Sequence, residues 1–194
     1  TVTVTVGPVN DRPVFSTLPA DMNLQEDVAD GESTFTVTDV ETDDAALSVT
    51  ATYISNGALF GTEDVTITKG EGGARKVTVN PKDNMFGTST VTLQVTDGDG
   101  ATNETPCTFT VTVASVNDEP TAGDTSVTTA EGTAAVIDVT SLIEDADTGD
   151  TLTVSVETGD GPANGGVSVS GNVITYTPKP DWNGTESFIY TVTD

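Results

Sequence analysis

Residues 1–13 read TVTVTVGPVNDRP, and residues 108–120 read TFTVTVASVNDEP. The two stretches align without a gap at a spacing of 107 residues. Each begins with alternating apolar and polar residues, which is typical of a half-buried β-strand, and continues with Val-Asn-Asp-x-Pro. A repeat at this spacing indicates that the chain contains more than one copy of the same domain.

A second repeated stretch supports the same alignment. Residues 80–97 read NPKDNMFGTSTVTLQVTD, and residues 177–194 read TPKPDWNGTESFIYTVTD. Alternation predicts one buried face per strand, and threonine fills the other face because its branched Cβ suits a strand and its hydroxyl tolerates water. The aligned positions predicted to face the core are Val77, Val79, Val91, Leu93 and Val95 in the first copy, and Ile174, Tyr176, Phe188, Tyr190 and Val192 in the second.

Turn signals such as Asn56-Gly57 and Asn183-Gly184 separate the short strands and predict an all-β antiparallel sandwich without helices. The repeat also predicts the domain boundaries. By this alignment, a complete first domain is followed by a linker and by a second domain that lacks its last strand. The expected segments are residues 1–13 as the last strand of a preceding repeat plus a linker, 14–114 as the first domain, 115–120 as the linker and 121–194 as the incomplete second domain.

Composition excludes several classes of function. The 194 residues carry 6 basic and 31 acidic side chains, a formal charge of -25, which repels nucleic acids and anionic membranes. The absence of histidine removes the usual Ser-His and Cys-His catalytic pairs and the commonest zinc ligand. A single cysteine, Cys107, forms no disulfide within the chain and is interpreted as a small buried residue. No apolar run approaches the length of a membrane span, and the first residues do not resemble a signal peptide.

The order of the acidic motifs resembles that of the cadherin superfamily, and more closely that of the cadherin-like and bacterial immunoglobulin-like tandem repeats of large bacterial adhesins. The resemblance implies tandem seven-strand Greek-key β-sandwiches. Each copy has an early Glu, an acidic loop motif, an Asp at the end of a late strand and an Asn-Asp linker. These are Glu26, Asp39-Val40-Glu41, Asp97 and Asn117-Asp118 for the first copy, and Glu131, Asp145-Ala146-Asp147 and Asp194 for the second, with Asn10-Asp11 before both.

The chain departs from the cadherin pattern in three places. Pro8 and Ser115 replace the first Asp of the linker motif, and an Asp-Arg-Glu motif is absent. Fewer calcium ions per junction are therefore expected than in cadherins. Trp182 precedes a late strand, so the resemblance does not extend to the tryptophan strand swap or to homophilic adhesion.

The resemblance implies Ca²⁺ as the cofactor, held at the domain junctions. Calcium takes six to eight oxygen ligands, and one loop seldom supplies that number. Other acidic residues, Asp43, Asp64, Asp99 and Asp160, are interpreted as turn residues that bond to nearby backbone. At the first junction, the expected ligands are Asn10, Asp11, Asp39, Glu41 and Asp97. At the central junction, they are Asn117, Asp118, Asp145, Asp147 and Asp194, with Asp150 as a further candidate. Glu26 and Asp83 or Asn84 are expected to approach the central junction from the first domain.

Three classes of function remain open at this level. The favoured one is a calcium-stiffened structural extender of an extracellular bacterial surface or secreted adhesin or filament. The second is an adhesion module that binds glycan or protein, for which 5% aromatic residues give little support. An enzyme is the weakest, because the carboxylates follow the repeat instead of one cleft. Partners are expected to be neighbouring copies or repeats of the same protein, head to tail. Residues 1–6 are expected either to act as a donor strand for the second domain of another copy, or to have the same geometry in a continuous array from which the chain is an excised unit.

Overall fold

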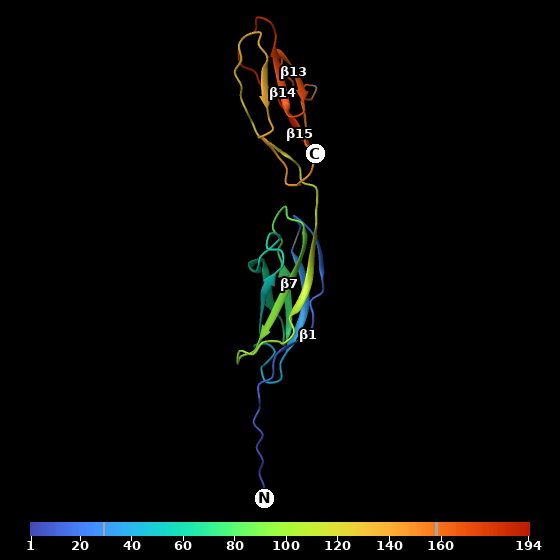
Figure 1. Cartoon of the computed structure of the whole chain (residues 1–194), viewed down its shortest axis with the longest axis vertical. Helices are drawn as coiled ribbons and strands as arrows, with labels where there is room; N and C mark the ends of the chain where they lie inside the picture. Colours follow the sequence, from blue (N-terminus) through green and yellow to red (C-terminus); the bar gives the residue numbers. More distant parts are fainter. Residues whose placement is uncertain (29, 158) are drawn as a thin grey trace. The chain divides into compact units, whose positions relative to one another are not determined.

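A computed structural model of the chain describes residues 1–28, 30–157 and 159–194. Its internal contacts divide it into two units, Thr1–Val116 and Asn117–Asp194, and each is described here by itself (Figure 1). Across the described residues, no helix has both the length and the apolar character needed to cross a membrane.

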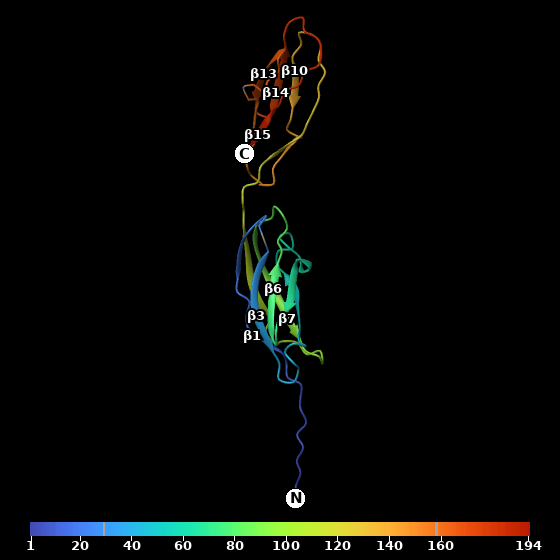
Figure 2. The ribbon, with the colours of Figure 1, turned by 180° about the vertical axis from the view of Figure 1, so that it is seen from behind.

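The first unit is a sandwich of two four-stranded sheets, so the expected all-β sandwich is confirmed. One sheet has the order β1-β3-β6-β5 and the other β2-β8-β7-β4. Figure 2 shows β3 and β6 side by side, as their antiparallel register requires. The expectation of no helix was wrong in one place, because a single 3-10 turn, η1 (Thr62–Asp64), leads into β5. The strands are β1 (Val14–Thr17), β2 (Met22–Gln25), β3 (Gly31–Thr38), β4 (Ser48–Ile54), β5 (Val65–Lys69), β6 (Ala74–Val79), β7 (Gly87–Thr96) and β8 (Cys107–Ala114).

The first strand of the sandwich is divided between the two sheets. β1 pairs antiparallel with β3, whereas β2 pairs parallel with β8. Pro19 lies between them and has no N–H to donate to a ladder, so the chain leaves one sheet there. Asp21 then accepts a hydrogen bond from the Thr110 N–H at 2.6 Å, which fixes the new position next to β8.

The core of the first unit follows the predicted parity. Val91, Leu93 and Val95 of β7 and Val77 and Val79 of β6 are all fully buried. The prediction for Cys107 is also confirmed: the side chain is buried, and burial raises the pKa of its thiol to about 11.

A buried arginine supports the loop between β3 and β4. Arg75 of β6 is 2% exposed, and its guanidinium donates hydrogen bonds to four backbone carbonyl oxygens. Two of these belong to Asp44 and Leu47 in the loop, at 2.8 and 2.9 Å, and two to Gly72 and Ala74, at 3.1 and 2.8 Å. Arg75 therefore connects the loop to the sheet that it leaves.

The second unit has the same plan with shorter strands. β14 lies between β10 and β13, β9 pairs with β11, and β12 pairs with β15, all antiparallel. Ile174 and Tyr176 are buried, while Phe188, Tyr190 and Val192 are only partly buried against the same core. The strands are β9 (Thr121–Ala122), β10 (Ala135–Asp138), β11 (Ile143–Glu144), β12 (Thr153–Ser155), β13 (Gly165–Ser170), β14 (Val173–Pro178) and β15 (Thr191–Thr193).

Replacing Arg75 by Met is expected to destabilise the first unit by about 2–4 kcal/mol, because buried carbonyls that lose their donors cost about 1–3 kcal/mol each. Lys76→Met is the matched control, since the Lys76 side chain forms an exposed ion pair with Glu32, and such pairs contribute at most about 1 kcal/mol. Urea unfolding followed by circular dichroism measures both variants. Fluorescence of Trp182, the single tryptophan, reports the second unit and should not change. Equal effects of the two substitutions would contradict the assigned role of Arg75.

Candidate metal centres

In the first unit, Asp39 folds the loop that follows β3. Its Oδ1 accepts the N–H groups of Glu41 and Thr42, at 3.1 and 2.7 Å. The Asp39 N–H donates to Oδ1 of Asp44 at 3.1 Å. Aspartate favours such turns because its short side chain bonds to backbone two or three residues away. The turn brings three carboxylates, those of Asp39, Glu41 and Asp44, into one loop.

Asp97 connects the end of β7 to the segment that precedes β1. Its Oδ1 accepts the N–H groups of Asp99 and Ala101, and its Oδ2 accepts Nδ2 of Asn10 at 2.9 Å. The hydrogen bond from Asn10 is the main reason that the pKa of Asp97 lies below its ordinary value, against the opposing effect of burial. Asp97 is therefore ionised at neutral pH.

The first predicted ligand set is brought together within the first unit. The Asp11 N–H donates to Oε2 of Glu41 at 3.0 Å, so the linker is bound to the loop as well as to Asp97. The linker pair Asn10 and Asp11 is thus hydrogen-bonded directly to Asp97 and Glu41, and Glu41 in turn is hydrogen-bonded to Asp39.

The second unit repeats the same three hydrogen bonds at the aligned positions. Asn117 Nδ2 donates to Oδ2 of Asp194 at 2.6 Å, as Asn10 does to Asp97. The Asp118 N–H donates to Oδ2 of Asp147 at 2.7 Å, and the Asp147 N–H donates to Oδ1 of Asp145 at 2.8 Å. Asn117, Asp118, Asp145, Asp147 and Asp194 therefore form a second cluster of the same geometry inside one unit.

The second cluster concentrates negative charge. Asp145, Asp150 and Asp194 each offer a carboxylate oxygen, and these oxygens lie within 4.8 Å of one another. Burial raises the pKa of Asp150, and the charges of Asp147, Asp145 and Asp194 raise it further. Like charges at this separation repel, so the arrangement favours a bound cation or proton.

Two carboxylate oxygens support the metal interpretation directly. Among the described residues, Oδ2 of Asp39 and Oδ2 of Asp145 are buried and have no hydrogen-bond partner. They occupy equivalent positions in the two repeats, each beside an Oδ1 that is bonded to the loop backbone. A buried carboxylate oxygen without a partner is costly, and a bound hard cation would offset that cost.

Glu26 and Asp83 lie elsewhere in the first unit. Glu26 is buried, and its Oε1 accepts the Val116 N–H at 2.8 Å, immediately before the linker pair of the second unit. Its Oε2 is buried and has no hydrogen-bond partner within the described parts of the chain. Asp83 is exposed in the turn before β7, next to Asn84, whose N–H donates to Oδ1 of Asp27. The contribution of Glu26 and Asp83 to the second cluster stays a prediction.

Two acidic residues of the first unit lie in turns as predicted, and a third lies in the first cluster without having been predicted there. Asp43 and Asp64 accept hydrogen bonds from the N–H groups of Ala45 and Gly61, as expected for turn residues. Asp44, by contrast, was not among the predicted ligands. The signal was present, since Asp44 follows Asp39 at the same spacing at which Asp150 follows Asp145.

Two solved structures are similar to this chain over most of its length. Among solved structures, the chain is similar to extracellular cadherin domains 3–6 of protocadherin gamma B2, with 20% identity and a TM-score of 0.47 over 88% of this chain and 39% of that one. It is also similar to an endo-fucoidan hydrolase of glycoside hydrolase family 107, with 18% identity and a TM-score of 0.43 over 98% of this chain and 28% of that one. The chain thus spans less than two thirds of either protein. A search of curated proteins finds no match.

The family comparison covers both units. The bacterial Ig domain family matches residues 10–112 and, a second time, residues 117–194. Each match contains one of the two acidic clusters, with its linker Asn-Asp pair at the start. The chain therefore belongs to the bacterial Ig domain family and carries two copies of its domain.

Proposed function

We propose that the two domains are calcium-stiffened spacer repeats of a bacterial protein that is displayed at the cell surface or secreted, where a string of such domains extends an adhesin or a filament. The observation that carries this proposal is the same set of three hydrogen bonds in both units, each joining a linker Asn-Asp pair to carboxylates at one end of a sandwich. The chain acts by position and stiffness and performs no catalysis.

The chemistry of the clusters favours calcium over other cations. Calcium accepts six to eight oxygen ligands at about 2.3–2.6 Å in flexible geometry. The second cluster offers carboxylates from Asp145, Asp147, Asp150 and Asp194, together with the linker residues Asn117 and Asp118. Zinc prefers nitrogen and sulfur ligands, and magnesium requires near-octahedral geometry and retains several waters, so neither matches this oxygen-rich set as well.

Cation binding would stiffen the linker because the linker supplies part of the site. Asn10 and Asp11 are exposed, and the hydrogen bonds that hold them contribute only about 0.5–1.5 kcal/mol each. Repulsion among the carboxylates opposes even this attachment when no cation is present. A calcium ion bound by both linker and domain removes the repulsion and holds the linker against the end of the sandwich.

Calcium is expected to raise the melting temperature of the chain, with affinity in the range of about 10⁻⁴ to 10⁻³ M that is common for extracellular calcium modules. At ten to a hundred times the dissociation constant, each site adds about 1–3 kcal/mol. Isothermal titration and thermal unfolding, with and without chelator, measure both quantities, and magnesium is the control ion. An identical melting curve in calcium and in chelator would remove the metal proposal.

Asp145→Asn is expected to weaken binding at the second cluster by roughly tenfold or more, since it removes one of the carboxylate charges that calcium requires. Asp39→Asn should do the same at the first cluster and leave the second intact. Asp160→Asn, in an exposed turn outside both clusters, is the matched control. Small-angle scattering in calcium then reports whether the linker is stiff. If all three variants bind calcium and scatter like the parent chain, the ligand assignment is wrong.

The stability of the second unit should depend on pH through Asp150. Its raised pKa means that the folded state holds this proton more tightly than the unfolded state does. The proton therefore stabilises the fold at low pH, and this contribution is lost as pH rises through the raised pKa. In chelator, Asp150→Asn should become more stable than the parent chain as pH rises from the ordinary aspartate range, about pH 4, toward neutrality. Calcium should reduce or reverse that difference, and parallel pH profiles in chelator would contradict the prediction.

A further inference from the structure

The segment between β14 and β15 carries a sequence motif that the acidic clusters do not use. Residues 181–185 read DWNGT, so Asn183, Gly184 and Thr185 form an Asn-x-Thr triplet. In exported proteins, this triplet is the acceptor for N-linked glycans when its asparagine lies in a surface loop. The first unit contains a second triplet, at residues 103–105, after β7. The structural settings of the two triplets can therefore be compared.

The backbone turn that carries Asn183 is the same in both units. The repeat aligns Asn183 with Phe86. Two other residues of each turn have a positive φ at aligned positions. These are Asn84 (56°) and Gly87 (131°) in the first unit, and Asp181 (59°) and Gly184 (147°) in the second. The conformation of the turn is therefore a property of the repeat.

Asn183 occupies a position that stays at the surface when the sheet beside it is complete. Phe86, the aligned residue, is 46% exposed, although β7 is paired with β8 from Gly87 onward. Asn183 is exposed as well. The accessibility of Asn183 thus follows from its place in the turn.

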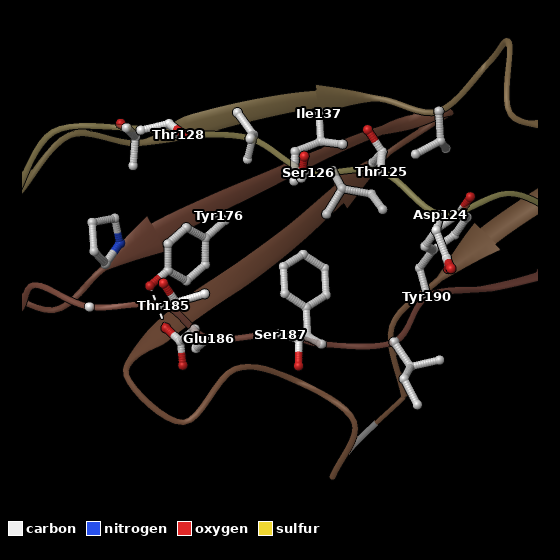
Figure 3. Close-up of a pocket in the computed structure, with 18 of the residues that line it drawn as sticks. Asp124, Thr125, Ser126, Thr128, Ile137, Tyr176, Thr185, Glu186, Ser187 and Tyr190 are labelled. Carbon is white, nitrogen blue, oxygen red and sulfur yellow. Dashed lines mark hydrogen bonds between the residues drawn. The ribbon is translucent and has the colours of Figure 1, made fainter.

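The Asn183 side chain takes no part in holding its turn together. Within residues 1–28, 30–157 and 159–194, its side-chain amide has no hydrogen-bond partner. Neighbouring residues shape the turn instead. The Trp182 ring packs against Gly184, where a Cβ would lie 3.2 Å from ring carbon Cζ2. Directly after the triplet, Oε1 of Glu186 accepts the Tyr176 hydroxyl, which connects the chain to β14 next to Thr185 (Figure 3).

Asn103, the asparagine of the other triplet, has a structural role in its loop. Its Oδ1 accepts the Val95 N–H at 2.9 Å, and its Nδ2 donates to the Thr105 carbonyl oxygen at 2.6 Å. Nδ2 is the atom that would carry a glycan, and here it faces the loop backbone. The residue two positions earlier is Ala101, which has no charge. The triplet at residues 103–105 is therefore the comparison that lacks the features of Asn183.

We propose that Asn183 is an acceptor for N-linked glycosylation, and that the transferase recognises Asp181 and Thr185 on either side of it. Both side chains are exposed, and neither has a hydrogen bond within the described parts of the chain. A carboxylate offers a transferase a charge-assisted contact with a basic residue, and a hydroxyl offers both a donor and an acceptor. The proposal rests on export of the protein, which is part of the proposed function.

The reaction joins a sugar to the Asn183 amide. Nδ2 attacks the anomeric carbon of an oligosaccharide that is carried on a polyprenyl diphosphate. A C–N bond forms while the bond from the anomeric carbon to the phosphate oxygen breaks, and the electron pair of that bond leaves on the diphosphate. Nδ2 gives up one proton and keeps the other. The glycan adds a bulky hydrophilic group to the surface.

A glycan on this turn leaves the acidic cluster of the same unit accessible. In the first unit, Phe86 precedes β7 and Asp97 follows it. The two positions are therefore separated by the length of the strand, about 30 Å. Asn183 and Asp194 are the aligned positions of the second unit. Glycosylation and calcium binding are thus expected to be independent of each other.

Export of the full chain in a bacterial host that contains an oligosaccharyltransferase and a lipid-linked oligosaccharide of known mass tests the proposal. Intact mass and peptide mapping should show one glycan, on Asn183. Asn183→Gln and Thr185→Ala should each abolish it. Asp181→Asn keeps the turn, because the first unit has Asn84 at this position, and should lower the occupancy. Thr105→Ala removes the other triplet and should leave the occupancy unchanged.

Transfer of the motif to the first unit tests whether the turn is sufficient. Phe86→Asn combined with Asn84→Asp completes the same Asp-x-Asn-x-Thr pattern with Gly87 and Thr88, and should create a second acceptor. An exported, folded chain with Asn183 unmodified, or a transferred motif that stays unmodified, overturns the proposal. Deamidation at Asn183 alone, which has a far smaller mass change than a sugar, also overturns it. Full occupancy in Asp181→Asn overturns the role of Asp181.

Calcium titration of the same preparations separates this proposal from the proposed function. A chain that binds calcium but gains no glycan overturns the glycosylation proposal alone. A chain that is glycosylated at Asn183 but does not respond to calcium overturns the calcium proposal alone.

Discussion

A strand inside a sheet satisfies its backbone polar groups only when other strands lie on both sides, and β7 meets this condition through β4 and β8. In the second unit, the aligned residues 184–193 pair with β12 over three residues, and residues 185–190 lie outside any strand. The same alternating pattern therefore gives a ten-residue strand in one copy and a three-residue strand in the other. Burial follows the pairing, since Val91, Leu93 and Val95 are fully buried whereas Phe188, Tyr190 and Val192 are only partly buried.

The two acidic clusters have equivalent hydrogen bonds but differ in the residue of the adjacent strand, which is charged in the first unit and neutral in the second. In the first unit, the guanidinium of Arg75 lies under the loop and bonds to the Asp44 carbonyl, and the Asp44 charge acts on it. The repeat places Asn172 at the aligned position of the second unit, so no fixed positive charge is supplied there. The raised pKa of Asp150 is consistent with this difference. The negative charge of the second cluster is therefore less compensated by the protein's own residues than that of the first.

Much of this structure could be predicted from the sequence because repeated, alternating patterns encode strand faces directly. The buried faces of β6 and β7 follow from the alternation within the repeat, and the meeting of each linker pair with its loop and strand end was implied by the resemblance to cadherin-like repeats. The division of the first strand between two sheets could not be predicted, because it depends on how Pro19 and Asp21 meet a strand about 90 residues away. The buried position of Arg75 was also missed, since an arginine in an alternating strand ordinarily faces water. Asp44 was missed although it follows Asp39 at the spacing at which Asp150 follows Asp145; its contact with the Asp39 N–H depends on how the loop folds.

The parallel pairing of β2 with β8 has a mechanical consequence. Met22 to Gln25 run in the same direction as Val111 to Ala114, and these are the strands nearest to the two ends of the first domain in their sheet. When β2 is pulled from its start and β8 from its end, the force lies along both strands and perpendicular to their hydrogen bonds. All the bonds between them are then loaded together in shear, instead of opening one after another from an end. A domain with this arrangement resists tension along the chain far better than it resists peeling at an edge.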